Sequence, residues 1–242
     1  MEKVILVASG KGGAGKSTVS ALLGEALALK GKKVLVIELD SGFRSLDVAF
    51  GVTKNLLFDF GDVIRQNCEI EDAAMPCPFC KNLSVICAAS SAAEFSCDDI
   101  SKIVNNSSDF DFIIFDCPAG IGKTLDYAAK VSELALITAT PDPSSVRAAR
   151  SASLYLEKCG LKNRRLIIER CPDKPKKLFP LQNLDEIIDG TELQLIGVVF
   201  EDTLVRKAMD SGLGLSPESV NYKVFGNIAE RILGKHIPLG FK

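Results

Sequence analysis

A glycine-rich segment near the start of the chain constrains the fold more than any other feature of the sequence. It reads Gly10-Lys11-Gly12-Gly13-Ala14-Gly15-Lys16-Ser17-Thr18 and fits the pattern G-x-x-x-x-G-K-[ST]. The segment follows the apolar run Val4–Ala8 and precedes a helical pattern that begins at Lys16. A strand, a glycine loop and a helix in this order form the context in which the pattern binds the phosphates of a nucleotide. The sequence therefore predicts a nucleoside triphosphate site.

The residue types of this loop suit phosphate binding for geometric reasons. Glycines let the backbone pass close to a phosphate and turn its N–H groups inward, and the positive end of the following helix points at the same phosphate. We expect Lys16 to reach the outer phosphates and the Ser17 hydroxyl to ligate magnesium. The loop residues expected to contact the nucleotide are Gly12, Gly13, Ala14, Gly15, Lys16, Ser17 and Thr18.

Apolar, β-branched runs alternate with helical patterns along the chain. The candidate strands are Val4–Ala8, Lys33–Leu39, Ser84–Ala88, Phe112–Asp116, Leu134–Ala139, Leu166–Glu169 and Leu195–Phe200. The candidate helices are Lys16–Lys30, Leu57–Arg65, Asp98–Asn106, Lys123–Val131, Ser144–Lys158, Leu204–Ser211 and Val220–Leu233. This alternation predicts an α/β fold with a doubly wound, mostly parallel sheet flanked by helices, in one domain over residues 1–242. The proline- and lysine-bearing stretch Arg170–Asp189 is expected to be an exposed loop.

Two acidic residues follow strand candidates at the edge of the sheet where ligands bind in such folds. Asp116 ends the run Phe112–Asp116, where a carboxylate can hold magnesium through water. Asp40 follows the run Lys33–Leu39, beside the place expected for the γ-phosphate. The phosphate loop and both acids are therefore expected to meet at one edge of the sheet.

Lys11 is a second lysine, at the start of the loop. The resulting run Lys-Gly-Gly-x-Gly-Lys-Ser resembles the deviant Walker A loop of the MinD/ParA group of ATPases. Similar segments extend from Lys3 to about Gly234. The resemblance implies ATP and Mg²⁺ as ligands, and a homodimer held by ATP in which Lys11 reaches the nucleotide of the partner. It also implies that Asp40 positions the attacking water and that Asp116 ends a Walker B-like strand.

The resemblance also implies an activity and a base pocket. The activity is ATP hydrolysis, slow by itself and stimulated by a protein partner, in a spatial switch for the division site or a related cellular structure. Arg170, Glu201 and Asp202 match the segments around the base pocket. Three positions depart from the group's pattern. Glu38 replaces a frequent aspartate, which affects how a magnesium-bound water is held. At the base pocket, Glu169 replaces a frequent asparagine and Phe200 a frequent proline, so base specificity follows from the resemblance and not from these two residues.

Composition and the end of the sequence indicate where the protein acts. No apolar run approaches the roughly 20 residues of a membrane span, and the N-terminus is not a secretion signal, so a cytoplasmic location with reduced cysteines is expected. MinD proteins usually end in a basic amphipathic helix that binds membranes, but Pro238 and Gly240 disfavour a helix here. We expect the apolar face of Val220–Leu233 to pack on the core and a partner to mediate any membrane association.

The main basic concentration is expected to be a solvated face. It contains Lys162, Arg164, Arg165, Arg170, Lys174, Lys176 and Lys177. Asp173 interrupts it, aromatic residues are scarce, and the net charge is −2. Nucleic acid is therefore not an expected partner.

Two alternative functions stay open at this stage. Cys77 and Cys80 form a C-x-x-C pair, with Cys68 and Cys87 nearby, and could hold zinc or an iron–sulfur cluster. Similar lysine-bearing loops occur in nitrogenase iron protein and in iron–sulfur scaffold ATPases, so the chain could be an ATP-gated metal carrier. A nucleotide-binding adaptor with negligible turnover is the other alternative.

Overall fold

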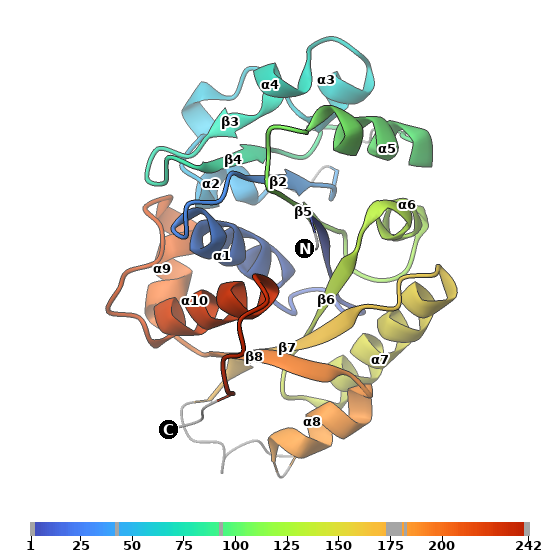
Figure 1. The fold of residues 1–242 in the computed structure, drawn as a ribbon, viewed down its shortest axis with the longest axis vertical. Helices are drawn as coiled ribbons and strands as arrows, with labels where there is room; N and C mark the ends of the chain where they lie inside the picture. Colours follow the sequence, from blue (N-terminus) through green and yellow to red (C-terminus); the bar gives the residue numbers. More distant parts are fainter. Residues whose placement is uncertain (1–2, 42–43, 92–93, 173–180, 182, 240–242) are drawn as a thin grey trace.

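The strands of the protein form one eight-stranded sheet in the computed structural model, which describes residues 3–41, 44–91, 94–172, 181 and 183–239 (Figure 1). The strands are β1 (Val4–Ala8), β2 (Val34–Glu38), β3 (Met75–Pro76), β4 (Leu83–Ile86), β5 (Phe112–Asp116), β6 (Leu134–Ala139), β7 (Arg164–Cys171) and β8 (Gln194–Phe200). Their order is β3-β4-β2-β5-β1-β6-β7-β8. All neighbouring pairs are parallel except β3 and β4, which are antiparallel. The predicted doubly wound, mostly parallel sheet is confirmed.

Helices connect the strands and cover both faces of the sheet. They are α1 (Lys16–Ala28), α2 (Leu46–Ala49), the 3₁₀ turn η1 (Thr53–Asn55), α3 (Phe60–Ile64), α4 (Ile70–Ala73), α5 (Cys97–Asn106), α6 (Lys123–Val131), α7 (Pro143–Lys158), α8 (Leu184–Thr191), α9 (Thr203–Ser211) and α10 (Val220–Ile232). Figure 1 shows α1, α9 and α10 on one side of the sheet and α5, α6 and α7 on the other. Within the described part of the chain, no helix is both long and apolar enough to cross a bilayer.

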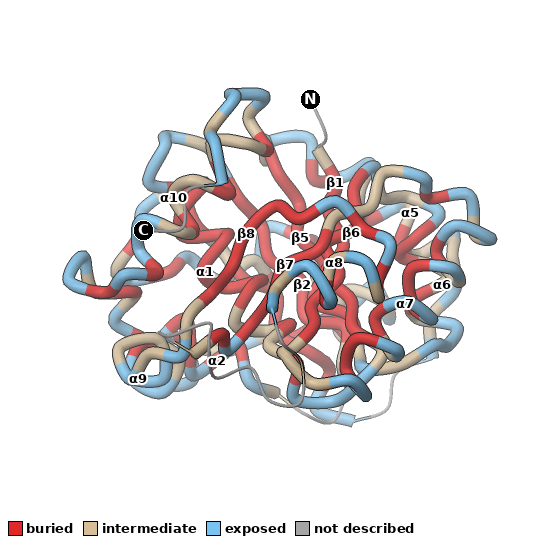
Figure 2. Tube along the Cα trace, turned by 90° about the horizontal axis from the view of Figure 1, so that it is seen from below, coloured by how far each residue is buried: buried red, intermediate tan, exposed pale blue. Residues whose placement is uncertain are grey.

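The sheet separates two apolar cores because successive residues of a strand point to opposite faces. In β1, Leu6 belongs to the core under α5, α6 and α7, whereas Ile5 and Val7 belong to the core under α1 and α10. Since both faces are covered, the central strands are buried along their whole length and read as continuous apolar runs (Figure 2).

The strand order places a crevice at the end of β1. The chain winds from β1 towards β2 on one side and later returns past β1 to β6 on the other, so the sense of winding changes beside β1. Ligands of open α/β sheets bind at the carboxyl ends of the strands around such a switch point. The loop after β1 is the phosphate loop of the sequence analysis.

Three local expectations were wrong. The stretch Arg170–Asp189 was predicted as a loop, yet α8 begins at Leu184, because the Asn183 side chain accepts a hydrogen bond from the Glu186 backbone and Ile187 packs in the core. The helix predicted from Leu57 begins instead at Phe60, after Asp59 and Asp62 form a capping box. The short elements α4 and β3 lie in a stretch for which no helix or strand was predicted.

Candidate nucleotide-binding site

The phosphate loop leaves the first helix with open amides at its N-terminus. Gly13 and Gly15 have φ values of 75° and 87°, in the region that favours glycine. Gly15 caps α1 without any side-chain hydrogen bond, and the first turn of the helix contains no acid. The first N–H groups of α1 therefore have no acceptor from a capping side chain, and no acid within their own turn competes with an anionic ligand.

Close contacts with two neighbouring segments fix the position of this loop. A Cβ added at Gly10 would lie 2.0 Å from the carbonyl oxygen of Ala148 in α7, so only glycine allows this approach. On the other side, the Gly120 backbone N–H donates to the carbonyl oxygen of Ser9 at 2.9 Å. The Ser9 hydroxyl also donates to the Lys11 carbonyl at 2.7 Å. The loop is thus tied to α7 and to the segment that follows β5.

Ser17 and Asp116 lie together, as the sequence analysis expected. The Ser17 hydroxyl donates to Oδ2 of Asp116 at 2.7 Å, and the Ser20 hydroxyl donates to Oδ1 at 3.0 Å. Asp116 is 2% exposed, and burial raises its pKa to about 7, against the opposite effect of the two hydroxyls and of Lys16. A hydroxyl and a carboxylate are the oxygen donors that Mg²⁺ prefers, so these residues fit the ion. Ser20 was not expected here; its position one helical turn after Lys16 is the signal.

Asp40 lies at the same edge of the sheet. It follows β2 directly and is half-buried, and the preceding residue, Leu39, donates its N–H to the Asp116 carbonyl at 2.9 Å. Burial raises the pKa of the thiol of Cys117, the residue after Asp116, and the negative charge of Asp40 adds to this shift. The expected meeting of the loop and the two acids therefore occurs.

Glu38 anchors the backbone beside this site. Its Oε1 accepts from the Ser45 N–H at 2.8 Å, the Ser45 hydroxyl at 2.9 Å and the Leu46 N–H at 3.3 Å, and its Oε2 accepts from the Ala88 N–H at 3.1 Å. Burial raises the pKa of Glu38, although these hydrogen bonds act against the shift. The side chain that departs from the family pattern thus joins β2 to the start of α2 and to the end of β4.

Lys11 is held within its own chain. Its ammonium group donates to Ser144 Oγ at 2.8 Å and to Asp142 Oδ1 at 3.3 Å. Asp142 also caps α7 by accepting from the Ser145 N–H. Although burial opposes the shift, hydrogen bonds from Ser144 and Thr140 hold the pKa of Asp142 well below its usual range. Lys11 is half-exposed, so this contact is weak enough to exchange for another.

A cavity of about 280 Å³ opens beside the first turn of α1. We call it the β7–β8 cavity; its lining residues are Thr18, Glu169, Arg170, Val199, Phe200, Glu201, Asp202, Val205, Arg206 and Met209. The three residues expected at the base pocket, Arg170, Glu201 and Asp202, therefore meet here. The Asp202 carboxylate is already engaged, because it accepts from the Leu204 N–H and from the Ser219 hydroxyl. Glu169, which the sequence analysis connected with base specificity, also lines the cavity, and Arg206 completes the charged lining without having been expected there.

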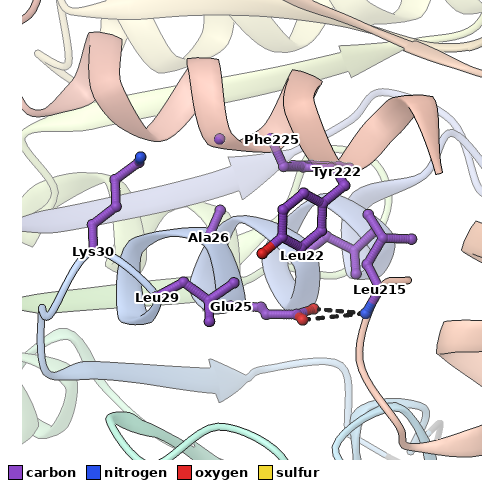
Figure 3. Close-up of a pocket in the computed structure, with 9 residues that line it drawn as sticks. Leu22, Glu25, Ala26, Leu29, Lys30, Leu215, Tyr222 and Phe225 are labelled. Atoms are coloured by element: carbon purple, nitrogen blue, oxygen red, sulfur yellow. Dashed lines mark hydrogen bonds between the residues drawn. The ribbon is translucent and has the colours of Figure 1, made fainter. Parts of the chain in front are cut away.

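A second cavity, of about 190 Å³, lies between α1 and α10 (Figure 3). Leu22 and Phe225 give it an apolar lining. Its carboxylate, Glu25, is occupied because both oxygens accept from the Leu215 N–H, at 3.2 and 3.1 Å. This cavity is separate from the phosphate loop, and its acid is committed to the backbone.

The cysteines behave as structural thiols in the part of the chain that is described. Cys77 and Cys80 are buried in the core under α1, and burial raises the pKa of Cys77 to about 12. Burial likewise raises the pKa of Cys87 to about 12. All eight cysteines are unpaired, and no cluster of three or more His, Cys, Asp or Glu side chains is placed to hold a metal ion among the described residues. Nothing supports the metal-carrier alternative.

The basic concentration is partly internal to the fold. Arg164 pairs with Glu157 at 3.0 Å and donates to the Ser153 carbonyl, and Arg165 donates to the Arg164 carbonyl. Lys174, Lys176 and Lys177 lie outside the described residues. Arg164 and Arg165 are thus engaged with the protein itself, whereas Lys162 and Arg170 are exposed.

Comparisons with known proteins agree with this geometry. Residues 2–159 match a family model described as an AAA domain. The chain is 32% identical to the septum site-determining protein MinD of Bacillus subtilis, over 99% of this chain and 92% of that protein. Among solved structures, a chain of the MinC:MinD cell division protein complex of Aquifex aeolicus matches with a TM-score of 0.90 and 30% identity, over 99% of this chain and 98% of that one. MinD of Pyrococcus horikoshii complexed with Mg-ADP matches with a TM-score of 0.82 and 26% identity, over 96% of both chains.

Proposed function

The chain belongs to the MinD family of P-loop ATPases, and from this premise we propose that it is an ATP-hydrolysing switch in division-site positioning. ATP and Mg²⁺ are its ligands, in agreement with the Mg-ADP complex of the related structure. The observation that carries the proposal is the hydrogen bond between Ser17 and Asp116 at the open end of α1. It joins a hydroxyl and a carboxylate, 99 residues apart in sequence, at the one place where a phosphate-bound magnesium needs them.

Each residue of the site has a distinct task in this proposal. Lys16 and the amides of α1 neutralise the phosphates. Ser17 and Asp116 would hold magnesium, which when bound would supply positive charge beside the phosphates. Asp40 orients the attacking water from the end of β2. Because phosphoryl transfer depends mainly on positioning and electrostatics, the protein needs no strong base for this step.

Lys11 acts across a homodimer in this proposal. It exchanges its contacts with Asp142 and Ser144 for the nucleotide of a partner subunit, where it stabilises transferred charge as an arginine finger does. Turnover is therefore slow in the single chain and rises when ATP and a partner protein hold the dimer. The weak, half-exposed contact of Lys11 supports such an exchange.

Recruitment to a membrane is assigned to a protein partner in this proposal. The apolar residues Phe225, Ile228 and Ile232 of α10 are at most 4% exposed, so this stretch of the helix is buried on the core, while Val220 and Tyr222 in its first turn stay exposed. The complex of a related MinD with MinC supports a protein as the partner class. We further propose that residues 1–242 form one ATPase domain, since the strands of the described part join a single sheet.

Lys11→Ala tests the dimer-dependent step. The variant is expected to bind ADP with wild-type affinity, because the phosphates contact the loop of their own chain, and to lose the rise of phosphate release with protein concentration. Losing the charge that stabilises transfer should lower the rate by about a thousandfold. Steady-state phosphate release over a range of protein concentrations measures the rate and its dependence on protein concentration. Wild-type turnover by Lys11→Ala at every concentration would exclude the role in trans.

Asp40→Ala tests the water-positioning step. With the phosphates and magnesium still held, the variant is expected to accumulate as an ATP-bound dimer, because binding proceeds and hydrolysis does not. Sizing chromatography with Mg-ATP compares it with the wild type, and Mg-ADP serves as the control that should leave both monomeric. A monomer in Mg-ATP with undiminished phosphate release contradicts this assignment. If the wild type itself releases no phosphate, the chain is an adaptor and not a hydrolase.

A further inference from the structure

Glu169 is a buried acid beside the phosphate loop that the proposed hydrolysis does not use. The residue is 3% exposed, and its Oε1 has no hydrogen-bond partner among the described residues. A Cβ added at Gly15 would lie 2.6 Å from Glu169 Cδ and 2.7 Å from Oε2, so the carboxyl group packs directly on the loop. Buried polar atoms in proteins are almost always paired. An unpaired oxygen at this position therefore points to a ligand as its partner.

A β-bulge aims Glu169 and its neighbour into the same cavity. Between positions 168 and 171, β7 carries one more residue than the facing positions 198–200 of β8, and Arg170 has a left-handed φ of 52°. Neighbouring side chains of a regular strand point to opposite faces, whereas a bulge re-aims them. Glu169 and Arg170 consequently both line the β7–β8 cavity.

The cavity is placed to receive a purine. Thr18, in the first turn of α1, belongs to its lining, so a nucleotide whose phosphates sit on that turn can extend its base into the cavity. Val199 and Met209 supply apolar surface, which suits the flat faces of a base.

We propose that Glu169 selects adenine over guanine in the bound nucleotide, with the unpartnered Oε1 bonding the edge of the base. The inference rests on the proposed ATPase function and adds the residue of this chain that decides which base is taken.

Burial and the charges around Glu169 together determine whether the protonated or the ionised carboxyl group meets the base. The charged residues that line the cavity or begin α1 are Arg170, Glu201, Asp202, Arg206 and Lys16. Burial is the larger effect and raises the pKa of Glu169 to about 8, whereas the charge of Arg170 favours the ionised form. At neutral pH the group is therefore mainly protonated, with one O–H donor and one acceptor oxygen.

A protonated carboxyl group complements adenine. It can accept from the N6 amino group and donate to N1 or N7, which is the pairing that asparagine and glutamine make with this base. Guanine presents only acceptors at O6 and N7, and its N1 and N2 groups are donors that suit an ionised carboxylate. Adenine binding therefore requires the proton on Glu169, and the affinity should fall as the pH rises through about 8.

Calorimetric titration of the wild-type chain with Mg-ADP and Mg-GDP tests the inference, and diphosphates avoid the ATP-dependent dimer. Between about pH 7.5 and about pH 9, the Kd for ADP should rise roughly tenfold, because only the protonated fraction of the protein binds. The Kd for GDP should not rise. At the lower pH, ADP should bind about tenfold to a hundredfold more tightly than GDP.

Two variants separate base reading from a structural role. Glu169→Gln keeps a donor and an acceptor at every pH, so its ADP affinity should match the wild type at about pH 7.5 and stay flat up to about pH 9. Glu169→Leu offers neither and should remove the preference between ADP and GDP. Glu71→Gln, which changes an exposed acid of α4 at the far end of the sheet, is the matched control and should keep the wild-type slope.

The outcomes distinguish this inference from the function on which it rests. A flat ADP affinity in the wild type, a wild-type slope in Glu169→Gln, or equal binding of ADP and GDP at about pH 7.5 would each overturn the role of Glu169 and leave nucleotide binding intact. Failure of the wild type to bind either diphosphate would overturn the proposed function instead. The titrations of the wild type and of Glu169→Gln decide the question even if Glu169→Leu does not fold.

Discussion

Replacing Gly10 with alanine is expected to weaken ADP binding by about a hundredfold and to lower the free energy of unfolding by about 3 kcal/mol. The added Cβ would lie 2.0 Å from the Ala148 carbonyl oxygen and 2.4 Å from its carbonyl carbon. Both atoms belong to the backbone of α7 and cannot rotate away. The phosphate loop must therefore shift from α7, and its amides then miss the phosphates.

Calorimetry with Mg-ADP and urea unfolding measure the two effects of Gly10→Ala. Gly226→Ala is the matched control, because a Cβ at that position in α10 meets nothing within 4 Å. It should bind ADP like the wild type and gain about 0.5–1 kcal/mol of stability, since alanine is the better helix former. Wild-type ADP affinity in Gly10→Ala would show that the close packing of the loop on α7 is not needed for binding.

Replacing Glu38 with alanine is expected to lower the free energy of unfolding by about 3–5 kcal/mol. The change leaves the buried backbone N–H groups of Leu46 and Ala88, and the part-buried N–H of Ser45, without their acceptor. Each unpaired donor costs about 1–3 kcal/mol. Part of this cost is offset because the variant no longer buries a carboxyl group, whose desolvation is itself unfavourable. The start of α2 and the end of β4 should loosen together.

Urea unfolding and hydrogen exchange of the segments around Ser45 and Ala88 measure this effect. Glu38→Gln should fall between the wild type and the alanine variant, because its amide oxygen replaces one acceptor while its NH₂ group faces another donor. The exposed Glu71→Ala is the control and should change stability by less than about 0.5 kcal/mol. A loss below about 1 kcal/mol in Glu38→Ala would mean that water satisfies these amides.

Several elements of the site could be predicted from local sequence alone. The loop from Gly10 to Thr18 and the apolar run that ends at Asp116 are continuous patterns, and β1 and β5 have the predicted bounds. Parallel strands bring their carboxyl ends to one edge, so the meeting of Ser17, Asp116 and Asp40 followed from the fold class.

Other features depend on contacts between distant segments. The structural role of Glu38 could not be predicted, because the N–H groups that donate to its carboxylate come from residues 45, 46 and 88. The sequence likewise gave no sign that Lys11 contacts residues 142 and 144, more than 130 positions away. Helix α8 was missed because proline and lysine dominate the composition of the preceding stretch, whereas one buried isoleucine and one capping asparagine define the helix.

The residue order by itself determined the class of fold, the phosphate loop and the choice of candidate catalytic residues, because each depends on a periodic pattern or a short contiguous motif. The tertiary structure decided which of these side chains are free and which are occupied. It showed Glu38 committed to the backbone, Asp202 to a helix cap, and Glu169 buried with an unpaired oxygen. The physical reason is that hydrogen-bond partners and desolvation are set by neighbours in space, and the crossovers of a doubly wound sheet bring those neighbours from remote parts of the chain.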